Sequence, residues 1–207
     1  MQLIRIGGTI TGYRSTNGST WTQAGSAAIA LSGTPLIGLA VTGHNDSQLN
    51  ATTFDNVLVS PATPTAAWQL AMFGPKWNNA TIAGDAADPD NDGANNLLER
   101  ALNGNANAND PAPLAQPGIV TGRLALTFTR STANTDLTLT AQAADTPAGP
   151  WTDLARSTSG AAFTVLAVGS TAIETGTGPT RTVEIRDLYP ITDPSHPRRF
   201  LRVQVQH

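Results

Sequence analysis

The chain has 207 residues, of which 40% are hydrophobic, with a formal net charge of -3 and no cysteine. This composition can fill a buried core, and it excludes a disordered polymer, disulfide bonds and thiolate metal sites. The basic residues are scattered, and no apolar run approaches the roughly 20 residues of a membrane-spanning helix, which excludes nucleic acid as a partner and a membrane span.

Residues 1–60 consist of short apolar runs separated by turn residues, among them Gly7-Gly8, Asn17-Gly18 and Ser32-Gly33. This spacing predicts an antiparallel meander of about six strands. The expected strands lie at residues 3–6, 9–14, 20–22, 28–31, 36–42 and 53–59.

Two short helices are expected after a proline-rich linker at residues 61–64. The first covers residues 66–73, with Thr65 as its N-cap and an apolar stripe that includes Trp68. The second begins at about Asn95 and ends near Gly104, a residue type that favours helix C-termini. Residues 65–104 therefore form a helix–loop–helix connector, and a second linker covers residues 105–121.

Strand periodicity returns in residues 122–207, where Leu124, Leu126 and Phe128 alternate with smaller or polar residues. Strands are expected at residues 123–130, 137–143, 151–155, 163–168, 181–187 and 200–206. Alternation with one buried face predicts an antiparallel β-sandwich of the immunoglobulin or fibronectin type III kind. The predicted fold class is mainly β.

Residues 88–99 match the calcium-loop pattern D-x-[DN]-x-[DN]-G-x5-E at every specified position. Alternate oxygen ligands can converge on one ion, and Gly93 permits the sharp turn between them. The predicted ligands are the side chains of Asp88, Asp90, Asp92 and Glu99, the carbonyl of Ala94, and Asn96, whose position often acts through water.

The alternative for this loop is a solvated acidic turn, since Asp, Asn and Gly are common in turns. Calcium is favoured because three neighbouring carboxylates repel one another without a cation. Magnesium prefers fewer protein ligands and stricter geometry. A calcium sensor normally uses paired loops and a methionine-rich groove, whereas this chain has one loop and only two methionines. We therefore expect Ca²⁺ as a structural brace.

Three resemblances follow from these residues. Residues 88–99 resemble the calcium loops of EF-hands, thrombospondin type 3 repeats and dockerins; dockerins carry two such loops. Residues 9–23, 37–45 and 51–57 resemble the C-terminal half of a laminin-G or concanavalin A-like jelly roll, which implies carbohydrate or protein binding. Residues 67–74, 97–104 and 198–203, together with the loop, are similar to C-terminal tails of large exported proteins from Verrucomicrobia-like bacteria.

Two further functions, sugar binding and glycoside hydrolysis, are suggested only by the presence of aromatic and acidic residues and not by a sequence motif. Tyr13, Trp21 and Trp151 could form a sugar-stacking platform, although aromatic residues on strands are more often core. Three acidic residues could supply the carboxylate pair of a glycosidase, but no catalytic signature surrounds them, and solvated strand faces explain them better. They are Glu174, Glu184 and Asp187.

The function expected from the sequence is a non-catalytic, calcium-stabilised structural or accessory module of a secreted or cell-surface bacterial protein. The alternative is a carbohydrate-binding module attached to a polysaccharide-degrading enzyme. Expected partners are a glycan or a cell-surface protein. Met1 to Arg5 lack a signal-peptide layout, so export is expected to depend on sequence outside this chain. The apolar face of the meander requires cover from the rest of the chain or from a second copy in a homo-oligomer.

Overall fold

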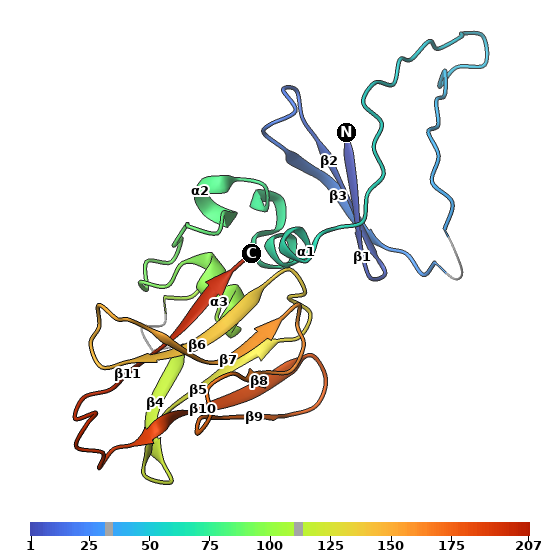
Figure 1. Ribbon diagram of the computed structural model, residues 1–207. Coiled ribbons are helices and arrows are strands. Elements are labelled where there is room, and N and C mark those ends of the chain that lie inside the picture. The colour runs from blue at the N-terminus through green and yellow to red at the C-terminus, as the bar shows by residue number, and fades with distance from the viewer. Residues whose placement is uncertain (32–34, 110–113) are drawn as a thin grey trace. The chain divides into compact units, whose positions relative to one another are not determined.

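The computed structural model describes residues 1–31, 35–109 and 114–207 (Figure 1). The chain divides into two compact units, Met1–Ala62 and Thr63–His207. The strands described form three antiparallel sheets, which confirms the predicted mainly-β class.

The first unit contains one three-stranded meander, in which β1 (Gln2–Ile6), β2 (Thr9–Arg14) and β3 (Thr22–Ala28) lie in sequence order. The β1–β2 hairpin turns at Gly7, whose φ of 57° is readily adopted only without a Cβ. The predicted strands at 3–6 and 9–14 are thus confirmed. The strand β3 occupies the span between those predicted at 20–22 and 28–31, so both of these were misplaced.

Residues 35–62 form no strand, and the predictions at 36–42 and 53–59 are wrong. The one backbone hydrogen bond within this segment runs from Gln48 N to Asn45 O, at 3.1 Å. Alternating apolar residues define a face, but a strand also needs a neighbour that pairs with its N–H and C=O groups. The described part of this unit supplies no such neighbour, and the predicted turn at Ser32-Gly33 lies outside the described residues.

The second unit begins with short helices, which are α1 (Pro64–Phe73), the 3-10 helix η1 (Gly74–Lys76), α2 (Ala80–Ala83) and α3 (Asn96–Leu102). Thr63 caps α1 by accepting a hydrogen bond from Ala66 N, so the predicted cap at Thr65 is wrong. Pro64 explains the earlier start, because its missing N–H costs nothing in the first helical turn. The predicted helix after the acidic loop is confirmed as α3.

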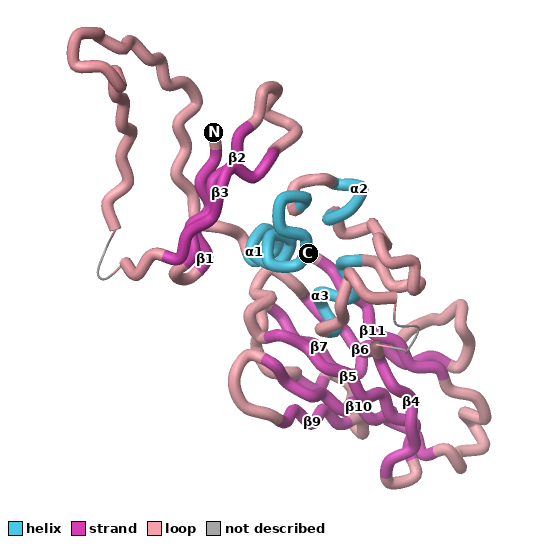
Figure 2. Tube along the Cα trace, turned by 180° about the vertical axis from the view of Figure 1, so that it is seen from behind, coloured by secondary structure: helices cyan, strands magenta, loops and turns pink. Residues whose placement is uncertain are grey.

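Eight strands follow, and they are β4 (Ala115–Val120), β5 (Arg123–Ser131), β6 (Thr138–Ala144), β7 (Thr152–Thr158), β8 (Thr164–Val165), β9 (Thr171–Thr175), β10 (Thr180–Pro190) and β11 (Phe200–Gln206). They form two four-stranded antiparallel sheets, ordered β4-β5-β10-β9 and β11-β6-β7-β8 (Figure 2). Both sheets contribute to one buried apolar cluster, so the arrangement is sandwich-like. The finer assignment to an immunoglobulin or fibronectin type III topology stays a prediction.

The helix α3 is part of that core. Ala101 and Leu102 are buried in the cluster, Leu97 and Leu98 pack against it, and the helix contacts β5 and β11. A second, smaller cluster joins α1 to α2, with the Trp68 and Phe73 rings meeting edge to face. The acidic loop therefore connects a small helical cluster to the core of the sandwich.

Two strands of the second unit were not predicted. The strand β4 lies inside the expected linker, and it was not predicted because its proline and glycine are residue types that disfavour strands. It pairs with β5 as an edge strand of its sheet. Thr121 and Gly122 both have positive φ and form the two-residue turn between β4 and β5. The short strand β9 pairs with β10.

Candidate calcium site

The acidic loop joins the end of α2 to the start of α3. Asn91 and Gly93 have φ values of 61° and 96°, and these two left-handed positions fold the loop back on itself. Asn95 caps α3 by accepting a hydrogen bond from Leu98 N at its side-chain oxygen. The loop therefore enters the helix in a fixed direction.

Three carboxylates converge inside this loop. One oxygen from each of Asp88, Asp90 and Asp92 lies within 4.8 Å of the others. Asp88 is oriented by hydrogen bonds from Asn91 N and Gly93 N, at 2.8 and 3.1 Å. Asp92 accepts a hydrogen bond from Ala94 N at 2.8 Å. Backbone N–H groups thus hold two carboxylates in place, and the arrangement could hold a metal ion.

Asp90 differs from its two neighbours. Both of its carboxylate oxygens are shielded from solvent, and among the described residues neither has a hydrogen-bond partner of ordinary geometry. Burial raises the pKa of Asp90 and the charge of Asp92 raises it further, and together with Asp88 they outweigh a weak contact with the Asp92 backbone that lowers it. A buried carboxylate without donors is costly, and a cation would compensate it.

Asn109 fixes the loop from outside the sequence motif. Its Nδ2 donates to the carbonyl oxygens of Asp90 and Asn91, at 2.8 and 3.0 Å. The motif gave no signal for this residue, because Asn109 follows the loop by ten positions in a segment expected to be a linker. Its two bonds hold the backbone at the point where the loop turns.

The remaining predicted ligands lie in or beside α3. Asn96 is fully buried, and its Nδ2 donates to Ile82 O and Gly84 O, both at 2.8 Å. The Asn96 amide thereby ties the start of α3 to the end of α2. Glu99 is 1% exposed, and it lies outside the group of three converging aspartates. The roles of Ala94, Asn96 and Glu99 as ligands stay predictions.

Polar contacts link α3 to the sandwich. Arg100 is buried, and its Nη1 contacts both oxygens of Asp136 at 3.0 and 3.1 Å. Asp136 also accepts a hydrogen bond from Thr65 Oγ1 at 2.6 Å. Asn134 Nδ2 donates to Arg100 O at 2.7 Å, and Thr129 Oγ1 donates to Leu102 O at 3.1 Å. Movement of α3 would break these bonds.

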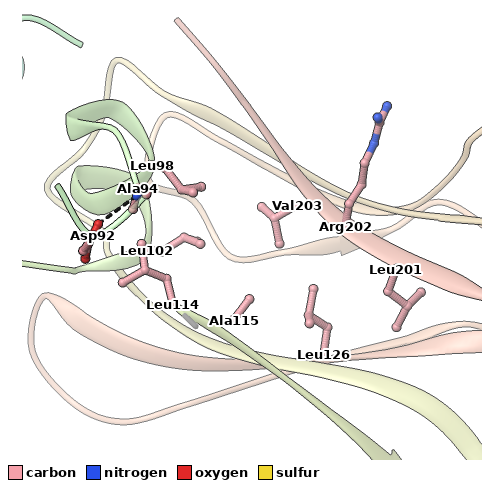
Figure 3. A pocket seen from close by; sticks show the side chains of 11 residues that line it. Asp92, Ala94, Leu98, Leu102, Leu114, Ala115, Leu126, Leu201, Arg202 and Val203 are labelled. Atoms are coloured by element: carbon pink, nitrogen blue, oxygen red, sulfur yellow. Dashed lines mark hydrogen bonds between the residues drawn. The ribbon is translucent and has the colours of Figure 1, made fainter. Parts of the chain in front are cut away.

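A pocket of about 340 Å³ lies where the loop, α3 and the two sheets meet (Figure 3). Figure 3 shows Asp92 and Ala94 at one end and the side chain of Arg202 directed away from the pocket. The rest of the lining is mainly leucine, valine and alanine from α3, β5 and β11 and from the start of β4. Residues of the loop and residues of the sandwich core thus line the same pocket.

The three candidate aromatic residues are divided between the two units. Tyr13 and Trp21 belong to the first unit, and Tyr13 is only 1% exposed, so its ring offers no flat face to solvent. Trp151 belongs to the second unit, where the guanidinium of Arg202 covers one face of its ring at 4.0 Å from the centroid. The sugar-stacking platform therefore gains no support from these positions.

Each of the three other candidate carboxylates has an arginine partner. Arg130 Nη2 lies 2.8 Å from Glu174, and Arg186 Nε lies 2.7 Å from Glu184. Asp187 is fully buried and bonded by two nitrogens of Arg199, at 2.7 and 2.8 Å. The expectation of a solvated strand face is therefore wrong for Asp187, because a bidentate arginine compensates its burial.

Comparison with protein-family models, with curated proteins and with solved structures finds no match to this chain. In the part of the chain that the structure describes, no helix is long and apolar enough to cross a membrane.

Proposed function

We infer that residues 88–99 bind one calcium ion and that the ion braces the second unit, as part of a non-catalytic accessory module of a secreted or cell-surface protein. The observation that carries this proposal is Asp90, whose two oxygens are shielded from solvent, have no hydrogen-bond donor of ordinary geometry among the described residues, and lie beside two further carboxylates. Several carboxylate oxygens from one loop suit calcium better than magnesium, which prefers fewer protein ligands and a stricter octahedral geometry.

The cost of the loop without a cation supports the proposal. Three aspartates carry three negative charges when ionised, and their converging oxygens lie within 4.8 Å of one another. Like charges at such distances repel, and a bound divalent ion converts this repulsion into attraction. Calcium would thus favour the folded loop over the unfolded chain, which cannot hold the ligands together.

The position of the loop supports a brace rather than a sensor. A sensor loop must release its helix to expose a binding surface. Here α3 contributes Leu102 to the sandwich core and Arg100 to an ion pair with Asp136. Release of this helix would expose core residues and leave the buried guanidinium of Arg100 unpaired. A bound ion would therefore stabilise the packed position of α3 and would not release the helix.

The absence of catalysis is part of the proposal. A glycosidase needs two carboxyl groups flanking its substrate, one of them free to transfer a proton. The candidates Glu174, Glu184 and Asp187 are instead each engaged in an ion pair with an arginine of the sandwich, and none of them faces another of the three across a cleft that the structure describes. We therefore assign these three residues to the stability of the sandwich.

Calcium titration of the full chain tests the proposal. We expect one site with a dissociation constant of about 10⁻⁴ to 10⁻³ M, the range of extracellular loops. At a hundredfold excess over that constant, the free energy of unfolding should rise by about 2.7 kcal/mol. Asp90→Asn should remove the calorimetric binding signal and most of the rise in melting temperature, because it removes a charged ligand.

Asp193→Asn is the matched control. It makes the same change of charge at an aspartate outside the loop, whose side chain likewise lies in a turn and accepts a hydrogen bond from a backbone N–H, that of Ser195. This variant should bind calcium as the parent does. Identical melting curves in calcium and in chelator would overturn the proposal, as would equal binding by the parent and the Asp90→Asn variant.

A further inference from the structure

The strand β3 (Thr22–Ala28) is an edge strand. It pairs with β2 on one side, and no described residue pairs with its other side (Figures 1 and 2). All of its residues are exposed. Such an edge presents unpaired N–H and C=O groups that match those of any other extended strand.

This edge lacks most of the features that keep edge strands from pairing. No Asp, Glu, Lys or Arg occurs from residue 15 to residue 45, and β3 contains no proline. Its one irregularity is a bulge at Ala24, between the pairs that Gly25 and Gln23 make with β2. The opposite edge, β1, carries Arg5. Charges and prolines are the usual protection of an edge, so β3 is the less protected of the two.

Several described apolar residues that follow β3 in the sequence are exposed. Ile29 and Leu31 are exposed, and farther along Leu36 and Ile37 are 97% and 73% exposed. Concentrated exposed apolar residues on a soluble protein mark an interaction surface. The edge and this apolar segment are adjacent in sequence, so one partner strand could cover parts of both.

We propose that β3 pairs antiparallel with β3 of a second copy of the chain, about a two-fold axis at Gly25. In this register, Gln23 of one copy lies opposite Ala27 of the partner subunit. If the same register continues past the end of the strand, Ile29 lies opposite Trp21 of the partner subunit. It opposes no like charges, and the central side chains are small enough to avoid clashes. A two-fold contact of this kind uses one surface twice and closes at the dimer.

We choose a second copy of the chain as the partner for the following reason. A strand that pairs with the free edge of β3 should be uncharged, with small side chains at its centre and apolar residues after it. The sequence of β3, TQAGSAA followed by Ile29 and Leu31, meets that demand. A charged partner strand would bury its charge against β3, which has no charged side chain to pair with it. The residues concerned lie outside the calcium loop, so this proposal and the calcium proposal succeed or fail separately.

Sedimentation of the full chain over a wide range of concentrations is the first test. The molar mass should rise from the monomer value of 21.4 kDa toward twice that value. Gln23→Lys combined with Ala27→Lys sets lysines opposite one another and should abolish the rise. Gln23→Glu combined with Ala27→Lys sets opposite charges together and should restore it. A mass of 21.4 kDa at every concentration, or equal behaviour of the two double variants, would overturn the proposal.

Cysteine trapping tests the position of the axis. The chain has no cysteine, and a Cβ added at Gly25 meets no atom within 4 Å, so Gly25→Cys is tolerated. Opposed residues of antiparallel strands lie about 4.5–5.5 Å apart at Cα, which suits a disulfide. Gly25→Cys should give a covalent dimer on oxidation, whereas the control Ser19→Cys, in the β2–β3 loop, should give far less. Equal trapping of both would place the contact elsewhere and overturn the proposal.

Discussion

The two units of this chain use the same alternation of apolar residues with opposite results. In the second unit, Leu126 and Phe128 on β5 are buried against the facing sheet. In the first unit, Leu3 on β1 is exposed, as are most large apolar residues after β3. Alternation defines a face for burial, but only a second layer makes that face a core.

The units differ in charge as well. The second unit buries charged groups with their partners, such as Arg100 with Asp136 and Arg130 with Glu174. The first has no Asp, Glu, Lys or Arg between residues 15 and 45. Buried, paired charges fix the position of neighbouring elements, whereas an uncharged strand edge leaves the sheet open to further pairing. The uncharged edge of β3 thus leaves the first unit open to further pairing.

The largest effect that would test this contrast comes from leucine truncation. Leu154→Ala removes a fully buried side chain from the sandwich, and we expect the free energy of unfolding to fall by about 4 kcal/mol, from lost transfer energy and a residual cavity. Leu49→Ala, at an exposed position of the first unit, should change it by less than about 0.5 kcal/mol. Urea unfolding followed by circular dichroism measures both. Similar losses in the two variants would mean that the first unit also has a packed core.

A somewhat smaller effect is expected from the Arg130–Glu174 pair, whose side chains are 2% and 14% exposed. Glu174→Gln leaves the guanidinium of Arg130 buried without its counter-charge, and we expect a loss of about 3 kcal/mol in unfolding free energy. The more exposed pair of Asp153 and Arg156, whose side chains are 34% and 45% exposed, provides the control, because Asp153→Asn should cost about 1 kcal/mol or less. Equal costs would show that burial does not determine the value of these pairs.

Much of the second unit could be predicted from its sequence. Alternation such as that of Leu124, Leu126 and Phe128 located β5, and Asn95 with the following apolar run located α3. The strand β4 could not be predicted, because Pro117 and Gly118 disfavour strands and its pairing with β5 is a tertiary effect. In the first unit, residues 36–42 and 53–59 have strand-like patterns without a partner to pair with. Local pattern carries no information on whether that partner exists.

The candidate metal site was predictable to a similar degree. The loop motif identified Asp88, Asp90 and Asp92, which the structure brings together. Asn109, which holds the loop backbone, lies outside the motif and could not be found from spacing. The burial of Arg100 was equally hidden, because its partner Asp136 lies thirty-six positions along the chain. Motifs encode local geometry, and the contacts that anchor a loop to the rest of a domain are long-range.

The smallest effect predicted is the acid sensitivity of the second unit through Asp136. Burial alone would raise the pKa of Asp136, but hydrogen bonds from Thr65 and Arg100 outweigh it and hold the pKa below its usual value. A carboxyl group with a lower pKa in the folded state contributes stability above its unfolded pKa of about 3.9, and that contribution is lost as the pH falls through the folded pKa. Asp136→Asn should therefore flatten the decline of unfolding free energy between about pH 5 and pH 2. Asp46→Asn, at an exposed position of the first unit, should leave that slope unchanged. The difference should be modest, because the Asp136 side chain is 25% exposed and solvent screens it. Parallel slopes for all three proteins would mean that the contact between α3 and the sandwich does not depend on the charge of Asp136.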